Sequence, residues 1–134
     1  MLTEGQRADL IRRAQEAQKG VYAPYSNYPV GAALLTSTGK VYLGANVENA
    51  AYPSSMCAER VAVFKAITEN DRSFEAMAIV TRDGGSPCGQ CRQVLSEFGL
   101  DTIFITANDN GEIVDESTIR DLLPGAFGPS NLGV

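Results

Sequence analysis

The chain has 134 residues, of which 44% are hydrophobic and 20% are charged, as is usual for a globular domain. Its 11 basic and 16 acidic residues give a formal net charge of -5, which repels a phosphate backbone and argues against a nucleic-acid partner. No apolar run reaches the roughly 20 residues that span a membrane, and the amino-terminal segment is charged and amphipathic rather than a signal sequence. We therefore expect residues 1–134 to form a single cytoplasmic domain that binds neither nucleic acid nor membrane.

The first part of the sequence predicts a helix, a loop and a hairpin. Residues 3–19 carry apolar side chains at helical spacing, with Thr3 and Gln6 as a capping box and Gly20 as the stop. Residues 22–31, YAPYSNYPVG, contain three tyrosines and two prolines and predict a rigid loop lined with aromatic side chains. The apolar runs VGAALLT and GKVYLGANV flank the turn STGK and predict an antiparallel hairpin.

The rest of the sequence alternates between helical and strand patterns. Residues 58–68 predict a helix whose buried face is formed by Val61, Ala62, Lys65 and Ile67. The runs EAMAIVT and DTIFIT predict buried strands, and SPCGQCRQVLSEFG between them predicts a loop that enters a helix and ends at a glycine. GEIV predicts an edge strand, and STIRDLLPGAF predicts a short helix that a proline stops.

This order of elements predicts an α/β fold. A strand, a helix and a second strand in succession form a crossover unit, and the complete order gives a mixed sheet covered by helices on both faces. The two helices that begin near Cys57 and Cys88 should start at the same edge of that sheet. We therefore expect the segments that carry the cysteines to meet there.

The three cysteines, Cys57, Cys88 and Cys91, predict a metal site. Three is an odd number, so one cysteine stays unpaired in any disulfide scheme, and a reducing compartment disfavours disulfides altogether. The pair Cys88 and Cys91 presents both sulfurs on one helix face, although the same spacing also occurs in redox pairs and structural zinc sites. With Cys57 as a third ligand and no histidine in the chain, a tetrahedral zinc ion would keep one position open for water, as catalytic sites do.

Two charged residues that follow Cys57 are candidates for chemistry at this site. Glu59 would lie beside the open position, where it can transfer protons between water and substrate. Three thiolates around one zinc ion carry a net charge of about minus one, so a nearby cation should withdraw part of that charge. Arg60 and Arg92 are the nearby cations, and we favour Arg60. Taken singly, a glutamate in a first helical turn or an arginine on a helix is more often structural.

The motifs CAER and PCGQC resemble the zinc-dependent cytidine deaminase family, in the three-cysteine variant that forms small homotetramers. The segments YAPYSNYPVGAALLT, NVENAAY, MCAER, SPCGQCRQV and LLPGAFGP match the family in the same order and cover nearly the whole chain. The resemblance implies a three-layer α/β/α fold with a five-stranded mixed sheet and one zinc ion per subunit. It also implies a hydrolase of pyrimidine salvage that converts cytidine and deoxycytidine to uridine and deoxyuridine and releases ammonia.

The resemblance also implies roles for individual residues. It makes the three cysteines the zinc ligands and Glu59 the proton shuttle between water, the ring nitrogen N3 and the departing amine. Asn46 and Glu48 of NVEN would hold the ribose hydroxyl, since a side-chain amide and a carboxylate offer a donor and several acceptors. The backbone amides around Ala58 and Cys88 would contact the base and the transition state.

Three aromatic residues complete the set that the resemblance implies. Tyr28 stands where the family often has phenylalanine near the pyrimidine, and its added hydroxyl needs water or a hydrogen-bond partner. Tyr52 matches a residue that contacts the sugar across an interface, and Phe127 matches the aromatic residue that reaches the base from a neighbouring subunit. We therefore expect a homotetramer whose neighbouring subunits complete each site, although core or interface packing alone is the ordinary role of such aromatic residues.

Other functions remain open at the level of the sequence. Related enzymes that deaminate antibiotic or modified cytosine nucleosides share the zinc motif, but NVEN favours an ordinary ribose. A structural zinc or redox module that uses Cys88 and Cys91 as a dithiol would leave Glu59 and NVEN without a role. An enzyme that edits polynucleotides is disfavoured by the short length and the negative charge.

Overall fold

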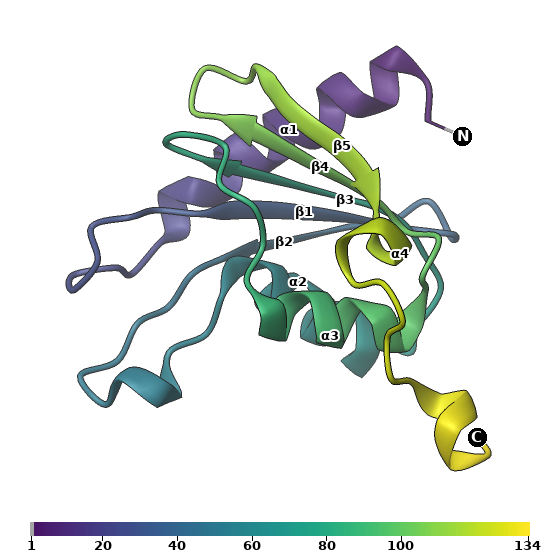
Figure 1. Cartoon of the computed structure of the whole chain (residues 1–134). Helices are drawn as coiled ribbons and strands as arrows, with labels where there is room; N and C mark the ends of the chain where they lie inside the picture. The colour runs from purple at the N-terminus through teal and green to yellow at the C-terminus, as the bar shows by residue number, and fades with distance from the viewer. Residues whose placement is uncertain (1) are drawn as a thin grey trace.

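The computed structural model describes residues 2–134 and contains a five-stranded mixed sheet of order β2-β1-β3-β4-β5 (Figure 1). Its strands are β1 (Gly31–Thr36), β2 (Val41–Ala45), β3 (Phe74–Thr81), β4 (Ile103–Asn108) and β5 (Ile113–Thr118). Strands β3 and β4 are parallel, and each of the other neighbouring pairs is antiparallel. The structure thus confirms the predicted α/β fold, the hairpin, the crossover unit and the edge strand.

Helices cover both faces of this sheet. Helix α1 (Glu4–Ala17) lies on one face, behind the sheet in Figure 1, and α2 (Ala58–Thr68), α3 (Gly89–Phe98) and the short α4 (Ile119–Leu122) lie on the other. Short 3₁₀ segments are formed by Gln18–Gly20, Tyr52–Ser54 and Pro129–Leu132. Among residues 2–134, no helix combines the length and apolar character needed to cross a bilayer.

Alternating side chains of the strands fill a core on each side of the sheet. In β1, Ala32 and Leu34 pack with α2 and α3, whereas Ala33 and Leu35 pack with α1. Because the central strands are buried on both faces, their sequences are unbroken apolar runs rather than alternating ones. This explains why short apolar segments such as GAALLT could be recognised as buried strands.

Two strand glycines let the helices approach the sheet closely. A Cβ atom at Gly31 would lie 1.9 Å from the carbonyl oxygen of Ala14 in α1, and a Cβ atom at Gly44 would lie 2.2 Å from that of Ala58 in α2. No side chain fits at either position without moving the helix. Gly44 therefore sets how closely the first turn of α2 packs against β2.

The topology brings the starts of α2 and α3 together. Strands β2 and β3 both pair antiparallel with β1, so they run in the same direction and end at the same edge of the sheet. Each of these strands is followed by a loop and then by a helix whose N-cap is a cysteine, Cys57 for α2 and Cys88 for α3. The predicted meeting of the two cysteine segments is confirmed.

Some local predictions need correction. The capping box of Thr3 and Gln6 is present, but α1 ends at Ala17, and the chain continues as a 3₁₀ turn to Gly20. The predicted buried face of α2 is wrong at Lys65, which is exposed and whose ammonium donates to a β2 carbonyl oxygen 2.7 Å away. The buried face is instead built from Ala58, Glu59, Ala62, Val63 and Ala66. Small and apolar residues occur on several sides of this helix, so the sequence pattern did not single out one face.

Candidate metal centre and pocket

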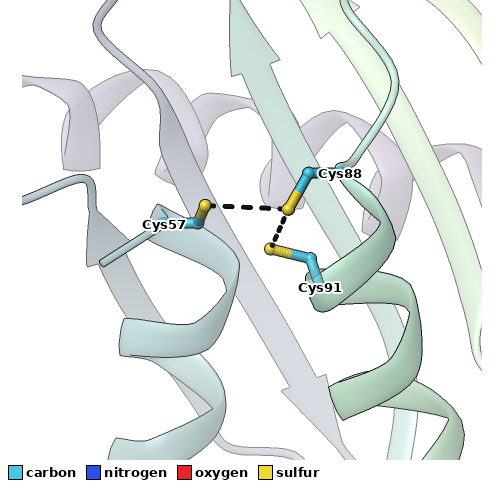
Figure 2. A group of neighbouring side chains, drawn as sticks. All are labelled: Cys57, Cys88 and Cys91. Atoms are coloured by element: carbon cyan, nitrogen blue, oxygen red, sulfur yellow. Dashed lines mark hydrogen bonds between the residues drawn. The ribbon is translucent and has the colours of Figure 1, made fainter. Parts of the chain in front are cut away.

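Figure 2 shows the three cysteines with their sulfur atoms turned toward one another. The Sγ atoms of Cys57 and Cys88 are 3.9 Å apart, those of Cys88 and Cys91 are 3.4 Å apart, and all three lie within 4.8 Å of one another. Zinc–sulfur bonds of about 2.3 Å at tetrahedral angles place ligand sulfurs about 3.8 Å apart. The thiols are thus spaced to bind one tetrahedral zinc ion. Within residues 2–134, no fourth side chain of a ligating type joins the group.

The starts of two helices hold these thiols in place. Cys57 and Cys88 are N-cap residues in extended backbone conformation, and Cys91 lies in the first turn of α3. Neither N-cap thiol caps the backbone N–H groups at the start of its own helix, so both side chains can turn toward a shared ligand. The partial positive charge at the helix N-termini favours the thiolate form that a metal requires.

The protonation of the cluster also points to a bound cation. The neighbouring Cys91 thiol, together with the Arg60 guanidinium, lowers the pKa of Cys57 to about 5. Conversely, the interaction with Cys57 and burial raise the pKa of Cys91. The two pKa values thus shift in opposite directions, and a divalent cation would favour the ionised form of each thiol that binds it.

The two candidate arginines occupy different places. Arg60 Nη2 donates to Cys57 Sγ at 3.3 Å, which puts its charge directly on the thiol cluster. Arg92 instead donates to the Ser86 hydroxyl at 2.8 Å and to two backbone carbonyl oxygens, those of Pro87 at 2.9 Å and Leu122 at 2.8 Å. Arg92 thus fastens the loop before α3 to the end of α4.

Glu59 lies in the first turn of α2, and only 4% of its surface is exposed. Burial, with a smaller contribution from the charge of Cys57, raises the pKa of this carboxyl. A carboxyl group with a raised pKa can exchange a proton with a reacting group more readily than an ordinary surface glutamate. The position and environment of Glu59 therefore suit proton transfer.

A cavity of about 280 Å³ is lined both by these residues and by the residues that are predicted to bind the substrate. This volume is near the lower end of the range for sites that bind small molecules. The lining includes Cys57, Ala58, Glu59 and Cys88 from the helix starts, and Asn46, Glu48 and Tyr28 from the loops. The structure thus gathers most of the predicted site residues around one small cavity.

Asn46 and Glu48 make hydrogen bonds within the protein that the sequence did not reveal. The Asn46 amide donates to the backbone carbonyl of Tyr28 at 3.0 Å and accepts from a nearby backbone N–H at 2.9 Å. Glu48 accepts from two backbone N–H groups of the loop 22–31 at 3.0 Å each, and from the Ser26 hydroxyl. Both side chains therefore shape the loop that lines the cavity, and both keep hydrogen-bonding capacity for a ligand.

Tyr52 and Phe127 do not line this cavity of their own chain, as far as residues 2–134 show. Tyr52 is 70% exposed, and its ring makes an edge contact with Tyr25 at a centroid distance of 5.8 Å. Phe127 is 57% exposed on the carboxyl-terminal arm, which extends away from the sheet in Figure 1, and its carbonyl oxygen accepts from Gln93 Nε2 at 2.9 Å. Both rings are thus available to a neighbouring molecule.

The sequence analysis missed Asp83, which is the partner of the Tyr28 hydroxyl. Tyr28 donates to Asp83 Oδ1 at 2.5 Å, across 55 positions of the sequence. The unmatched hydroxyl of Tyr28 signalled that a partner was needed, but nothing in the sequence indicated which residue would supply it.

A mixed sheet that brings three thiols and a buried glutamate together at two helix starts defines a zinc-dependent deaminase site. Residues 5–107 match the family described as "Cytidine and deoxycytidylate deaminase zinc-binding region". The chain belongs to this family. The family match and the three-thiol cluster together confirm the predicted zinc cofactor.

Known relatives extend the likeness over almost the entire chain. The cytidine deaminase of Sporosarcina psychrophila is 48% identical over 127 residues, which cover 92% of each chain. That of Halalkalibacterium halodurans is 49% identical over 121 residues, which cover 88% of this chain and 91% of the other. The crystal structure of cytidine deaminase from Burkholderia pseudomallei has a TM-score of 0.86 at 43% identity and covers 94% of this chain and 100% of its own.

Proposed function

We propose that this chain is a cytidine deaminase of pyrimidine salvage, a hydrolase that converts cytidine or deoxycytidine and water to uridine or deoxyuridine and ammonia. The observation that carries the proposal is the buried Glu59 beside three zinc-spaced thiols in a cavity that Asn46 and Glu48 also line. The identity of 48% and 49% to two cytidine deaminases supports the same reaction. Residues 1–134 act together as one catalytic domain.

Metal binding and proton transfer are divided between neighbouring residues in this proposal. Cys57, Cys88 and Cys91 hold one zinc ion per subunit, and zinc, when bound, supplies a Lewis acid that makes water acidic enough to react at neutral pH. Glu59 accepts one proton from the attacking water and gives it to ring nitrogen N3, and it then carries the second proton of that water, from the new hydroxyl on the ring carbon, to the departing amine. The N–H groups at the start of α2, around Ala58, donate hydrogen bonds to the base.

The remaining cavity residues select the nucleoside. Asn46 and Glu48 use their spare hydrogen-bonding capacity to hold the ribose hydroxyl, and the Tyr28 ring lies along the pyrimidine. We propose that the protein is a homotetramer, in which Tyr52 and Phe127 of neighbouring subunits contact the sugar and the base. The exposure of both rings and their absence from the lining of their own cavity, within residues 2–134, support this arrangement.

The test is to incubate zinc-loaded protein with cytidine and to follow the ultraviolet absorbance of cytosine together with ammonia release. We expect equal amounts of cytosine lost and ammonia formed. In Glu59→Ala the rate should fall by at least about 10²- to 10⁴-fold, because the proton carrier is missing. The zinc content of both proteins, measured in parallel, shows whether the loss arises from the carboxyl group or from the metal.

The opposite result would also be informative. If the zinc-loaded, folded protein leaves cytidine and deoxycytidine unchanged, the proposed function is wrong for these substrates. A screen of modified and antibiotic cytosine nucleosides would then identify the substrate class that this cavity accepts.

A further inference from the structure

The hydrogen bond from Tyr28 to Asp83 ties together two separate walls of the cavity. Tyr28 belongs to the loop 22–31. Asp83 belongs to the 82–86 segment, which is part of the loop between the end of β3 and Cys88. Tyr28 lines the cavity from the first wall, and Gly85 and Ser86 line it from the second. The width of the cavity between these walls therefore depends on how the two segments are held together.

Further contacts fix the 82–86 segment against the same tyrosine. The Arg82 guanidinium lies over the Tyr28 ring, 5.5 Å from its centroid, and donates to the backbone carbonyl of Asn27 at 2.5 Å. The backbone N–H of Gly85 donates to Thr81 Oγ1 at 2.9 Å, which anchors the other side of the segment. The tyrosine thus contacts the segment through both its ring and its hydroxyl.

Two glycines allow the segment to pass through a narrow space. Gly84 has φ of +73°, and a Cβ atom there would lie 2.3 Å from Val114 of β5. A Cβ atom at Gly85 would lie 2.8 Å from the Tyr28 hydroxyl. The segment is therefore packed between β5 on one side and the tyrosine on the other, so a change at the tyrosine is transmitted to Gly85 and Ser86.

The Tyr28 hydroxyl is committed to the protein rather than to a ligand. Its hydrogen bond lowers the pKa of the Asp83 carboxyl, so the acceptor is a carboxylate at neutral pH. A hydroxyl that donates to an ionised acceptor forms a stronger hydrogen bond than one that donates to a neutral group. A phenylalanine at this position would keep the ring but would lose this tie.

Resting on the proposed function, we infer that Tyr28 and Asp83 are a positioning pair, which holds Gly85 and Ser86 at the distance from the tyrosine ring that a nucleoside requires. The pair acts on substrate binding through the cavity wall. It takes no part in the transfer of protons, which belongs to Glu59. Its loss should therefore weaken binding of cytidine more than it slows the chemical step.

The test compares Tyr28→Phe, Asp83→Ala and the double variant with the unmodified zinc-loaded protein. We expect each single variant to raise the KM for cytidine about three- to tenfold, with kcat changed less than about twofold, because one hydrogen bond to a positioned wall is lost. The double variant should be no worse than either single variant, since both remove the same interaction. Asp83→Asn, which keeps an acceptor oxygen, should recover most of the affinity.

Tyr42→Phe is the matched control. The Tyr42 hydroxyl donates to Glu69 at 3.0 Å and to Asp71 at 3.1 Å, and neither carboxylate lines the cavity. Its removal should lower thermal stability and leave the KM unchanged. The inference is overturned if Tyr28→Phe leaves the KM at the unmodified value, if Tyr42→Phe raises it equally, or if the effects of the two single variants multiply in the double variant.

Amide hydrogen exchange gives a readout that does not depend on activity. Without the tie, the N–H of Gly85 should exchange at least about threefold faster in Tyr28→Phe than in the unmodified protein or in Tyr42→Phe. Equal exchange in all three proteins would refute the inference. If the unmodified protein fails to deaminate cytidine, the proposed function is wrong, and the exchange measurement alone then decides whether the pair positions this wall.

Discussion

At the scale of single residues, Arg60 is the cation that contacts the cysteine cluster. Arg60 Nη2 donates to Cys57 Sγ at 3.3 Å, and its positive charge offsets part of the excess negative charge of three thiolates. A metal with less negative charge around it is a stronger Lewis acid. We therefore expect Arg60 to act on catalysis electrostatically and separately from metal binding itself.

We predict that Arg60→Gln folds and binds zinc but has a kcat about ten- to a hundredfold lower, the usual range for residues that support metal ligands. The measurement is steady-state kinetics on protein whose zinc content has been determined. Arg12→Gln, which removes an exposed charge on α1, is the matched control and should behave as the unmodified protein does. Unchanged kinetics in fully zinc-loaded Arg60→Gln would show that the contact does not tune the metal.

At this scale, the sequence could predict how residues lie when they are only a few positions apart. Cys88 and Cys91 are three positions apart, and Glu59 follows Cys57 by two positions. Helix geometry alone therefore predicts how the members of each pair lie relative to one another. The bond between Tyr28 and Asp83 depends on how two distant loops fold, so no local pattern contains it. The same reason explains why the bonds of Asn46 and Glu48 to the loop 22–31 were not anticipated.

At the scale of elements, the packing of α2 on β2 sets the position of Cys57 and Glu59. Gly44 faces the first turn of α2, where a Cβ atom would lie 2.2 Å from the Ala58 carbonyl oxygen and 2.7 Å from the Ala62 nitrogen. These are backbone atoms, so the contact is relieved only by movement of the helix. Cys57 and Glu59 would move with it.

We predict that Gly44→Ala lowers the free energy of unfolding by about 1–3 kcal/mol through overpacking and also reduces the zinc content. Thermal denaturation and metal analysis of the purified protein measure the two effects. Gly20→Ala is the control, because a Cβ atom there meets no atom within 4 Å. A Gly44→Ala protein with ordinary stability and full zinc would mean that the start of α2 tolerates displacement.

The elements themselves were largely predictable, because each has a strong local signal. Capping residues begin α1, and apolar runs between turn residues mark the strands. The buried face of α2 was not, because AERVAVFKA is apolar on several sides and only contact with β2 decides which side is covered. Tertiary packing thus determined the feature that the helical period left open.

At the scale of the whole molecule, the carboxyl-terminal arm places an aromatic ring away from its own cavity. Phe127 is 57% exposed, and the bond of its carbonyl oxygen to Gln93 fixes the arm to α3. An exposed aromatic ring on a fixed arm suits contact with another subunit. No sequence pattern within one chain reveals a contact with another subunit, so the proposal that Phe127 completes a neighbour's site rests on the family resemblance and on the exposure of the ring.

If Phe127 completes the site of a neighbouring subunit, two weakly active variants should restore each other. We expect Phe127→Ala to lower kcat/KM by about tenfold or more and Glu59→Ala to be nearly inactive, because each lacks one part of every site. In randomly mixed oligomers with equal shares of both chains, about one quarter of the sites would join an intact Glu59 to an intact Phe127 of the neighbour. Activity should therefore approach about a quarter of the unmodified value. Mixed oligomers, verified by native mass spectrometry, that are no more active than the average of the two parents would show that each cavity functions without the neighbour's aromatic ring.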